Sequence, residues 1–268
     1  MIDKFIKINT ATAGPILINA TDVSSVIHKG SYTRLNVGQN HYYDVDNIPF
    51  ISGTHTALEV ASGTTTADGT GGWPPQLIDS NATFTSSGIL PGDRIFDNPV
   101  TQILDGLNPY EDISNIIVND TTLSNLSNNA MTSGIDYKIY SGNKIFDANT
   151  DFVAAGVQAG MAVILTRGQA GATPISNLFV QSVSTNTITL IGVNNDYIAN
   201  YGAPQVLADR ALGLDGANEP VTYKIFNPAQ STVQTAINSA IVDVLNNTAT
   251  TSVVELPFVV DAAKSKGL

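Results

Sequence analysis

The stretch GILPGDRIF, residues 88–96, decides how this chain is organised, because the chain repeats it. Sixty-eight residues further on, residues 156–164 read GVQAGMAVI, with both glycines in the same places. The same offset aligns two more pairs, Asp79 with Asp147 and Phe84 with Phe152. Self-similarity at a fixed offset is typical of repeat architectures. Residues 77–140 and 144–226 are therefore predicted to be two copies of one unit.

Glycines mark the expected turns of each copy. Gly88 and Gly156 follow short stretches that we expect to form a helical turn ending in the left-handed conformation. Pro91-Gly92 suits a type II turn, whose second central residue needs a positive φ, and Gly160 takes the place of Gly92 in the second copy. Gly88, Gly92, Gly156 and Gly160 are thus predicted to be structural turn residues. Four short strands per copy favour a small β-barrel or sandwich.

The two ends of the chain are predicted to form one base domain, residues 1–50 plus 227–268. Three short strands of one small antiparallel sheet are expected near residues 5–8, 16–19 and 23–27. A helix is predicted from Val233 by apolar spacing of i, i+3, i+4 and i+7, with Ser231 and Gln234 as a capping box. A strand at 252–260 carries Pro257, which indicates an edge position, and the residues after Asp261 are expected to be a tail.

The predicted fold class is therefore mainly β. Two tandem barrel- or sandwich-like repeats would be inserted into a small α+β base domain that carries one C-terminal helix. Residues 51–76 are rich in Gly and Thr and are predicted to be a loop or extended arm.

Two loops contain the candidate interface residues. Trp73, between Gly-Gly and Pro-Pro, could anchor an interface or fold onto its own domain. Between its last two strands the second copy has a longer loop than the first, residues 192–221, and this loop carries Tyr197 and Tyr201. We expect that loop to have a contact role that the first copy lacks.

Charge and composition narrow the function classes. The net charge of −11, from 12 basic and 23 acidic residues, opposes binding to nucleic acid or to an anionic membrane, and no Lys/Arg cluster offsets it. The chain has no cysteine, which excludes thiolate catalysis and disulfides. The first residues have no apolar core typical of a secretory signal, and no stretch is long enough to span a bilayer, so we expect synthesis in the cytoplasm.

No group of residues resembles a catalytic or metal centre. His28, His41 and His55 are far apart in the sequence and are expected at the surface or in loops. The oxygen-rich stretches at 44–47 and 215–219 do not complete a known calcium loop, and Asp93 is interpreted as a turn-stabilising residue. Neither cofactor, metal ion nor enzymatic activity is predicted.

Several stretches together resemble structural proteins of tailed-bacteriophage virions. They are Phe5-Ile6-Lys7-Ile8, Ile16-Leu17-Ile18-Asn19-Ala20-Thr21-Asp22-Val23, Val233-Gln234-Thr235-Ala236-Ile237-Asn238, Val253-Val254-Glu255, and the Gly-x-x-Pro-Gly-Asp unit at residues 88–93. The second copy departs from that unit with Ala159-Gly160-Met161. The resemblance implies a protein without a cofactor that binds other virion subunits, often as a symmetric oligomer.

The leading hypothesis is a non-enzymatic capsid decoration (cement) protein in the virion. It would bind the major capsid protein or other virion subunits, and its own copies as a homo-oligomer, through the loops near 52–76 and 192–221. A tail or baseplate component is the second hypothesis. A carbohydrate-binding or hydrolytic β protein is the third.

Overall fold

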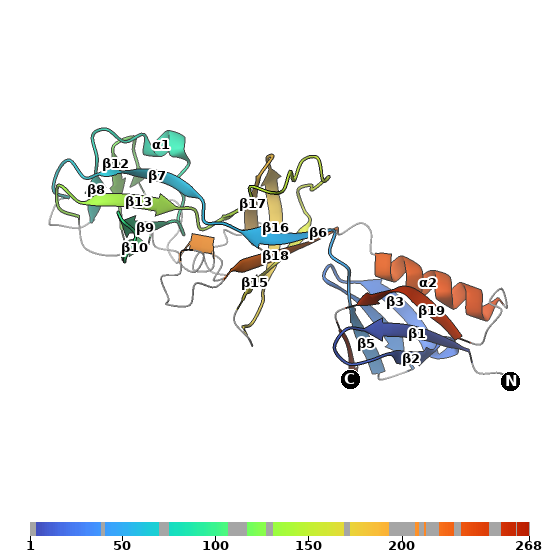
Figure 1. The fold of residues 1–268 in the computed structure, drawn as a ribbon. Helices are drawn as coiled ribbons and strands as arrows, with labels where there is room; N and C mark the ends of the chain where they lie inside the picture. Colours follow the sequence, from blue (N-terminus) through green and yellow to red (C-terminus); the bar gives the residue numbers. More distant parts are fainter. Residues whose placement is uncertain are drawn as a thin grey trace. The chain divides into compact units, whose positions relative to one another are not determined.

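The computed structural model describes residues 4–38, 41–69, 75–106, 117–126, 131–168, 172–192, 207–208, 212, 220–227, 232–246, 253–260 and 262–267. The mainly β class is confirmed, and the strands of these described residues form five sheets (Figure 1). The chain divides into two compact units. Unit 1 comprises residues 1–51 and 225–268, close to the 1–50 and 227–268 expected for the base domain, and unit 2 comprises residues 52–224.

The described residues of unit 1 form two sheets and one long helix. The three-stranded sheet has the order β19-β1-β2, and the four-stranded sheet has the order β20-β5-β4-β3. The elements are β1 (Phe5–Thr10), β2 (Ile16–Asn19), a 3-10 turn (Ala20–Asp22), β3 (Val23–His28), β4 (Tyr32–Val37), β5 (His41–Asp46), α2 (Thr232–Leu245), β19 (Val253–Val260) and β20 (Ala263–Gly267).

The apolar stripe of α2 closes the core of unit 1. Val233, Ile237, Ala240 and Val244 are buried and belong to one cluster with apolar side chains of both sheets, such as Ile6 and Leu35. Because these positions follow the 3.6-residue period of an α-helix, they lie on one face of α2, and that face alone covers the core. Because β1 and β19 pair in parallel, the first and last parts of the chain are held in one sheet.

Repeat 1 lies in unit 2 and forms a four-stranded sheet, β10-β9-β13-β7, and a three-stranded sheet, β11-β12-β8. Its elements are β7 (Glu59–Thr64), β8 (Gln76–Ile78), α1 (Phe84–Ser87), β9 (Arg94–Asp97), β10 (Ile103–Gly106), β11 (Ile117–Val118), β12 (Thr122–Ser124) and β13 (Asp136–Tyr140). The Thr66 amide donates to the Ile78 carbonyl at 2.9 Å and joins the two sheets.

Repeat 2 forms a six-stranded, nearly closed sheet with the order β14-β17-β16-β15-β18-β6. Its elements are β6 (Ile51–His55), β14 (Lys144–Phe146), β15 (Ala162–Arg167), β16 (Ile175–Val183), β17 (Thr187–Gly192) and β18 (Val221–Phe226). The Thr56 amide donates to the Phe146 carbonyl at 2.8 Å, which links the two edge strands. This bond is the counterpart of the Thr66–Ile78 bond in repeat 1.

The prediction of a loop or arm over residues 51–76 is wrong for much of that range. β6 pairs with β18 and completes repeat 2, and β7 pairs with β13 and completes repeat 1. Gly and Thr do not prevent strand formation here, because the partner strands supply the hydrogen bonds and the packing surface. Repeat 1 is consequently nested inside repeat 2, since the chain makes one strand of repeat 2 before it enters repeat 1.

Two smaller expectations for the chain ends also need correction. The predicted tail after Asp261 contains β20, which pairs antiparallel with β5. The third predicted strand becomes β3, which pairs with β4 rather than with β2. The capping-box position Ser231 lies outside the described residues, so the capping box stays a prediction, and the Gln234 side chain donates to the Val26 carbonyl at 3.2 Å.

Candidate functional site

The candidate site is the outer face of the four-stranded sheet in unit 1, which we call the Tyr–Arg face. Side chains alternate across a strand, so Thr33 and Leu35 of β4 are buried while Tyr32, Arg34 and Asn36 lie on the opposite face. Cross-strand pairing places further side chains beside them. The Tyr–Arg face comprises Ser25, Ile27, Tyr32, Arg34, Asn36, Tyr42, Asp44, Asp46 and Lys264.

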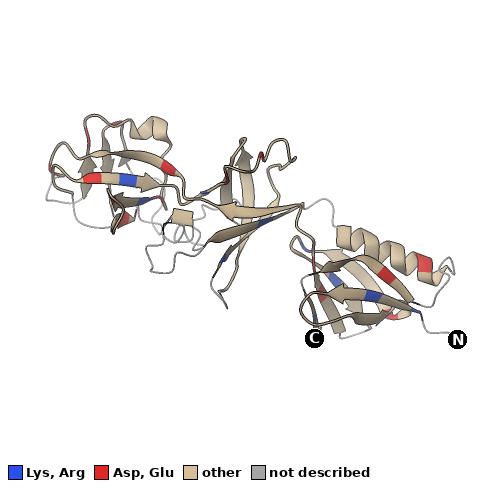
Figure 2. Ribbon diagram, viewed as in Figure 1, with Lys and Arg blue, Asp and Glu red and all other residues tan. Residues whose placement is uncertain are grey.

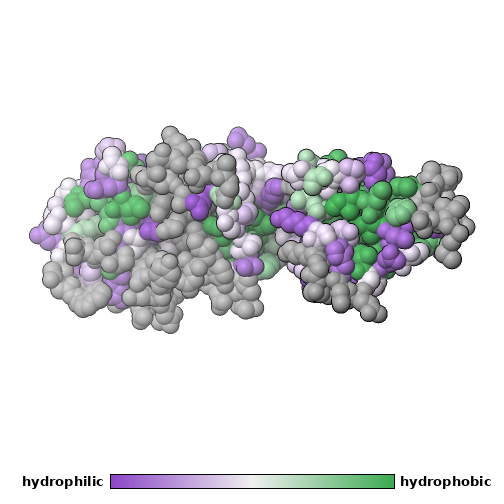
Figure 3. Space-filling model, turned by 90° about the horizontal axis from the view of Figure 1, so that it is seen from below, coloured by the Kyte–Doolittle hydropathy of each residue, from purple (hydrophilic) through white to green (hydrophobic). Residues whose placement is uncertain are grey.

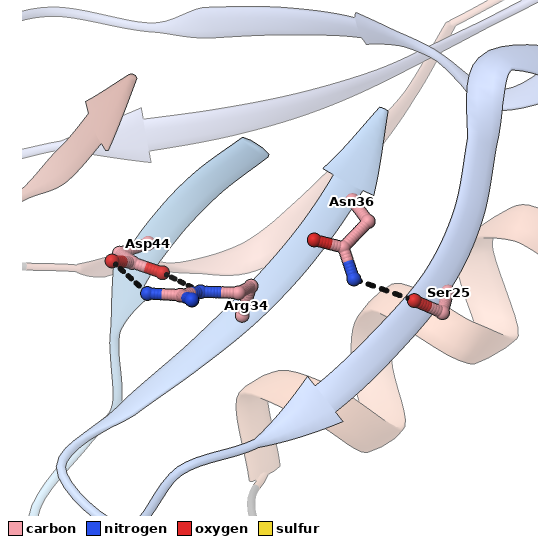
Figure 4. Close-up of polar contacts among 4 residues, drawn as sticks. All are labelled: Ser25, Arg34, Asn36 and Asp44. Atoms are coloured by element: carbon pink, nitrogen blue, oxygen red, sulfur yellow. Dashed lines mark hydrogen bonds and ion pairs between the residues drawn. The ribbon is translucent and has the colours of Figure 1, made fainter. Parts of the chain in front are cut away.

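Arg34 is the centre of this face. Its Nε donates to Asp44 Oδ1 at 2.8 Å and its Nη2 to Asp44 Oδ2 at 2.9 Å, a two-point geometry that fixes the guanidinium plane (Figure 4). The hydrogen bonds from Arg34 to Asp44 raise the pKa of Arg34 above its usual range. The side chains of Arg34 and Asp44 remain 27% and 14% exposed, so a partner could reach the pair.

Two tyrosines flank the guanidinium. The Arg34 Cζ atom lies 4.0 Å from the centre of the Tyr42 ring and 5.7 Å from that of Tyr32. Both distances are within the range of a cation–π contact. Two residues further along β4, Asn36 Nδ2 donates to Ser25 Oγ of the neighbouring strand β3 at 2.7 Å (Figure 4). The face therefore presents aromatic, guanidinium and amide groups that are ordered before any partner binds.

The two repeats each contain a second polar feature, a buried tyrosine bonded to a buried aspartate. Tyr137 Oη donates to Asp79 Oδ2 at 2.8 Å, and Tyr223 Oη donates to Asp147 Oδ2 at 2.7 Å. Burial raises the pKa of Tyr137 and of Tyr223, and the hydrogen bond to the carboxylate raises each further. Because both pairs are buried, we interpret them as structural bonds of the repeat rather than as reactive groups.

Asp93 holds the junction between the repeats. Its Oδ2 accepts a hydrogen bond from the Leu90 amide at 2.8 Å, and its Oδ1 accepts one from the Gly142 amide at 2.8 Å. Asp93 is only 1% exposed, and burial raises its pKa to about 7. The carboxylate thus stabilises its own turn, as expected, and also fixes the segment that leads into repeat 2.

His55, expected at the surface or in a loop, is buried in β6. Its Nδ1 accepts from the Phe146 amide at 3.0 Å, which leaves Nε2 to donate to the Leu207 carbonyl at 2.8 Å. Burial lowers the pKa of His55 to about 4, so the ring is neutral at pH 7. Ala208 and Leu212 pack in one apolar cluster with Phe96 and Tyr140 of repeat 1. The described part of the 192–221 loop therefore has a contact role inside the molecule.

The four predicted turn glycines all have positive φ angles. The values are 68° for Gly88, 93° for Gly92, 81° for Gly156 and 87° for Gly160. Gly88 follows the last residue of α1, and the Asp93 amide donates to the Leu90 carbonyl around Gly92 at 3.1 Å. The matching bond around Gly160 runs from the Met161 amide to the Gln158 carbonyl at 3.3 Å. Trp73, Tyr197 and Tyr201, the candidate interface residues, lie outside the described residues.

Sequence reasoning missed the Tyr–Arg face. Its signal is the period-two alternation of polar or aromatic residues at 32, 34 and 36 and again at 42, 44 and 46. That alternation predicts two half-buried strands, but only their register places Arg34 opposite Asp44. The roles of Asp79 and Asp147 were also missed, although the repeat alignment had already paired them.

Other kinds of site find little support in the described part of the chain. Its His, Asp and Glu side chains form no group that could hold a metal ion. Its helices include none long and apolar enough to cross a membrane. Lys and Arg are scattered over both units instead of forming a basic patch there (Figure 2). Comparison of the chain with protein-family models, curated proteins and solved structures gives no match.

Proposed function

We propose that this chain is a non-enzymatic structural protein of a tailed-bacteriophage virion that decorates the capsid. It binds the major capsid protein or a neighbouring virion subunit, and its own copies. The observation that carries the proposal is the Tyr–Arg face, where Arg34 is held by two hydrogen bonds to Asp44 and lies between two tyrosine rings. Tyr and Arg are enriched at the centres of protein interfaces, where ordered side chains lose little entropy on binding.

The electrostatics support a protein partner over a polyanion. The net charge of −11 repels phosphate groups, and the guanidinium of Arg34 is already paired with the Asp44 carboxylate. A glycan would stack on an aromatic ring. The Arg34 guanidinium already covers one side of the Tyr42 ring, with Cζ 4.0 Å from the ring centre. A tail or baseplate position uses the same surface, so the location in the particle has to be measured.

Immunogold electron microscopy of particles from the source tests the location. Gold over the whole head is the expected result, and gold only on the tail would favour the tail or baseplate hypothesis. The absence of label from particles, with a working positive control, would overturn the virion proposal. A glycan array and a reducing-sugar assay would then decide the carbohydrate hypothesis.

A co-sedimentation assay with undecorated capsids tests the face itself. Arg34→Ala is expected to weaken binding at least tenfold, because it removes the guanidinium from between the tyrosines and leaves Asp44 without its partner. Lys138→Ala is the matched control, since Lys138 forms a similar surface ion pair with Glu59 at 2.9 Å in repeat 1. Equal binding of both variants would contradict the assignment of this face.

A further inference from the structure

The second feature of unit 1 that calls for a partner is the edge of its three-stranded sheet. In the order β19-β1-β2, the strands β19 and β2 form the two edges. Proteins commonly protect a sheet edge with proline, charge or an irregular register. β19 has such protection, because it contains Pro257 and its register against β1 shifts between Lys7 and Asn9.

β2 has none of these protections within its bounds. Its sequence is Ile-Leu-Ile-Asn, with no charge, no proline and no register shift against β1. Leu17 is 55% exposed on the outer side of the sheet. Figure 3 views the molecule from below and shows apolar surface gathered on this side of unit 1.

The hydrogen-bond pattern shows which backbone groups of β2 face outward. The Ala20 amide donates to the Lys4 carbonyl, so residues 4 and 20 form a hydrogen-bonded pair of the antiparallel ladder. Such pairs alternate, which makes Ile6–Ile18 and Ile8–Ile16 the next ones. The amide and carbonyl groups of Leu17 and Asn19 must then point away from β1.

We infer that β2 pairs antiparallel with β2 of a second copy of this chain, so that two three-stranded sheets become one six-stranded sheet. The alternation of faces allows only registers that place odd residues opposite odd residues. Pairing Leu17 with Leu17 of the second copy gives two reciprocal bonds at the two-fold axis. It also sets Asn19 opposite Pro15, so that the Asn19 amide can donate to the Pro15 carbonyl. Proline has no backbone amide, so no donor of Pro15 is left without an acceptor.

Charge does not oppose a second copy at this edge, although it does elsewhere on the chain. Two chains of charge −11 repel at most of their surfaces. β2 itself is uncharged, and the nearest charges on its sheet neutralise one another, because Lys7 Nζ lies 3.1 Å from Glu255 Oε2. A two-fold contact here brings Leu17 against Leu17 and sets no carboxylate of the strand against another. This inference deepens the proposed function, because it locates the self-association that the function includes.

Sedimentation velocity of the full chain over a wide concentration range tests the inference. The wild type is expected to form a species of twice the 28.2 kDa chain mass. Leu17→Lys sets two charges against each other at the axis, and Leu17→Pro removes an outward amide without removing a bond to β1. Both variants should weaken dimerisation at least tenfold. Val259→Lys is the matched control, because Val259 is 59% exposed on β19 and should leave the dimer intact.

A wild type that stays monomeric at every concentration overturns the inference, and so does a dimer that both Leu17 variants leave unchanged. Hydrogen exchange of the wild type decides the matter should a variant fail to fold. Protection of the Leu17 and Asn19 amides should rise with protein concentration, and protection that does not change with concentration contradicts the contact. These solution results are separate from the gold labelling, so a monomeric chain that decorates capsids would refute only this contact.

Discussion

At the scale of single residues, one position in β6 and one in β7 must be glycine, because neighbouring side chains leave no room for a Cβ atom. A Cβ on Gly53 would lie 2.6 Å from Asp147 Oδ2, and a Cβ on Gly63 would lie 2.8 Å from Tyr137 Oη. Both contacts are with the buried Tyr–Asp pairs, whose atoms have no room to move without breaking a hydrogen bond. The same triad of Gly, Tyr and Asp therefore recurs in both repeats.

Gly53→Ala and Gly63→Ala should each lower the free energy of unfolding by about 1–3 kcal/mol, because the added methyl overpacks a filled site. Urea unfolding of each variant measures this change. Thr54→Ala, at an exposed position of β6 beside Gly53, serves as the control and should change stability by less than about 0.5 kcal/mol. Glycine variants as stable as Thr54→Ala would show that these strands do not pack over the Tyr–Asp pairs.

Asp93 should give the molecule a measurable pH dependence. Burial raises its pKa from 3.8 to about 7, so the folded state favours the protonated form. Its contribution to stability is complete below about pH 4 and is lost as the pH rises to about 7. Between these pH values the free energy of unfolding of the wild type should fall by about 1.4 kcal/mol per pH unit relative to that of Asp93→Asn, which carries no charge at this site.

Urea unfolding of the wild type and Asp93→Asn at several pH values measures that difference. Asp97→Asn is the control. Hydrogen bonds from Thr101 lower the pKa of Asp97, so the titration of Asp97 changes the free energy of unfolding only below about pH 4. The difference between wild type and Asp97→Asn should stay flat from pH 4 to 7. A flat difference for Asp93→Asn as well would mean that Asp93 is already ionised in the folded protein at pH 4.

At the scale of elements, the sequence predicts locally determined features better than those that depend on distant partners. The turn glycines follow from local φ requirements, and α2 follows from a periodic apolar stripe, so both could be derived. β6 and β7 could not, because their partners β18 and β13 lie far along the chain. Their signal is the tripeptide Ser-Gly-Thr, which occurs at 52–54 and again at 62–64.

The same reason explains how much of the candidate site could be predicted. The alternation in β4 and β5 indicates a polar face, but a shift of one residue in register would separate Arg34 from Asp44. The aromatic residues that stand out in the sequence, such as Trp73, were chosen because loops often carry function. The Tyr–Arg face lies on regular strands, where that rule does not apply.

Helix α2 should be indispensable to unit 1. Ile237→Asp places a charge in a position that is fully buried between the helix and both sheets, and should cost more than about 3 kcal/mol. Asn238→Asp adds the same charge on the exposed side of the same helix turn and should be nearly neutral. Thermal melts followed by circular dichroism compare the two. If Ile237→Asp melts like Asn238→Asp, the helix does not close the core.

At the scale of the whole molecule, the chain enters and leaves each part in nested order. The first and last segments pair in unit 1 through β1 and β19, and the next pair inward, β6 and β18, belongs to repeat 2. Repeat 1 is the innermost part and uses one continuous segment from β7 to β13. Each outer part therefore holds the two ends of the part inside it.

Nesting predicts that repeat 1 can be removed without unfolding the rest. Thr56 and Phe146 are hydrogen-bonded at 2.8 Å, so a glycine-rich linker of about four residues can replace residues 57–142 and join Thr56 to Asn143. The shortened chain should retain β6 in repeat 2 and keep a cooperative melt. Its stability should fall, because the partners of Ala208 and Leu212 in repeat 1 are lost.

The matched control is the same shortened chain with Gly53→Ala, which weakens the packing of β6 in repeat 2. Amide exchange should show protection of β15 to β18 in the shortened chain and less protection in the control. This contrast follows because β6 is the only described strand of repeat 2 that precedes repeat 1 in the chain. A shortened chain that exchanges all its repeat 2 amides rapidly would contradict this prediction, because it would show that repeat 2 cannot close without repeat 1.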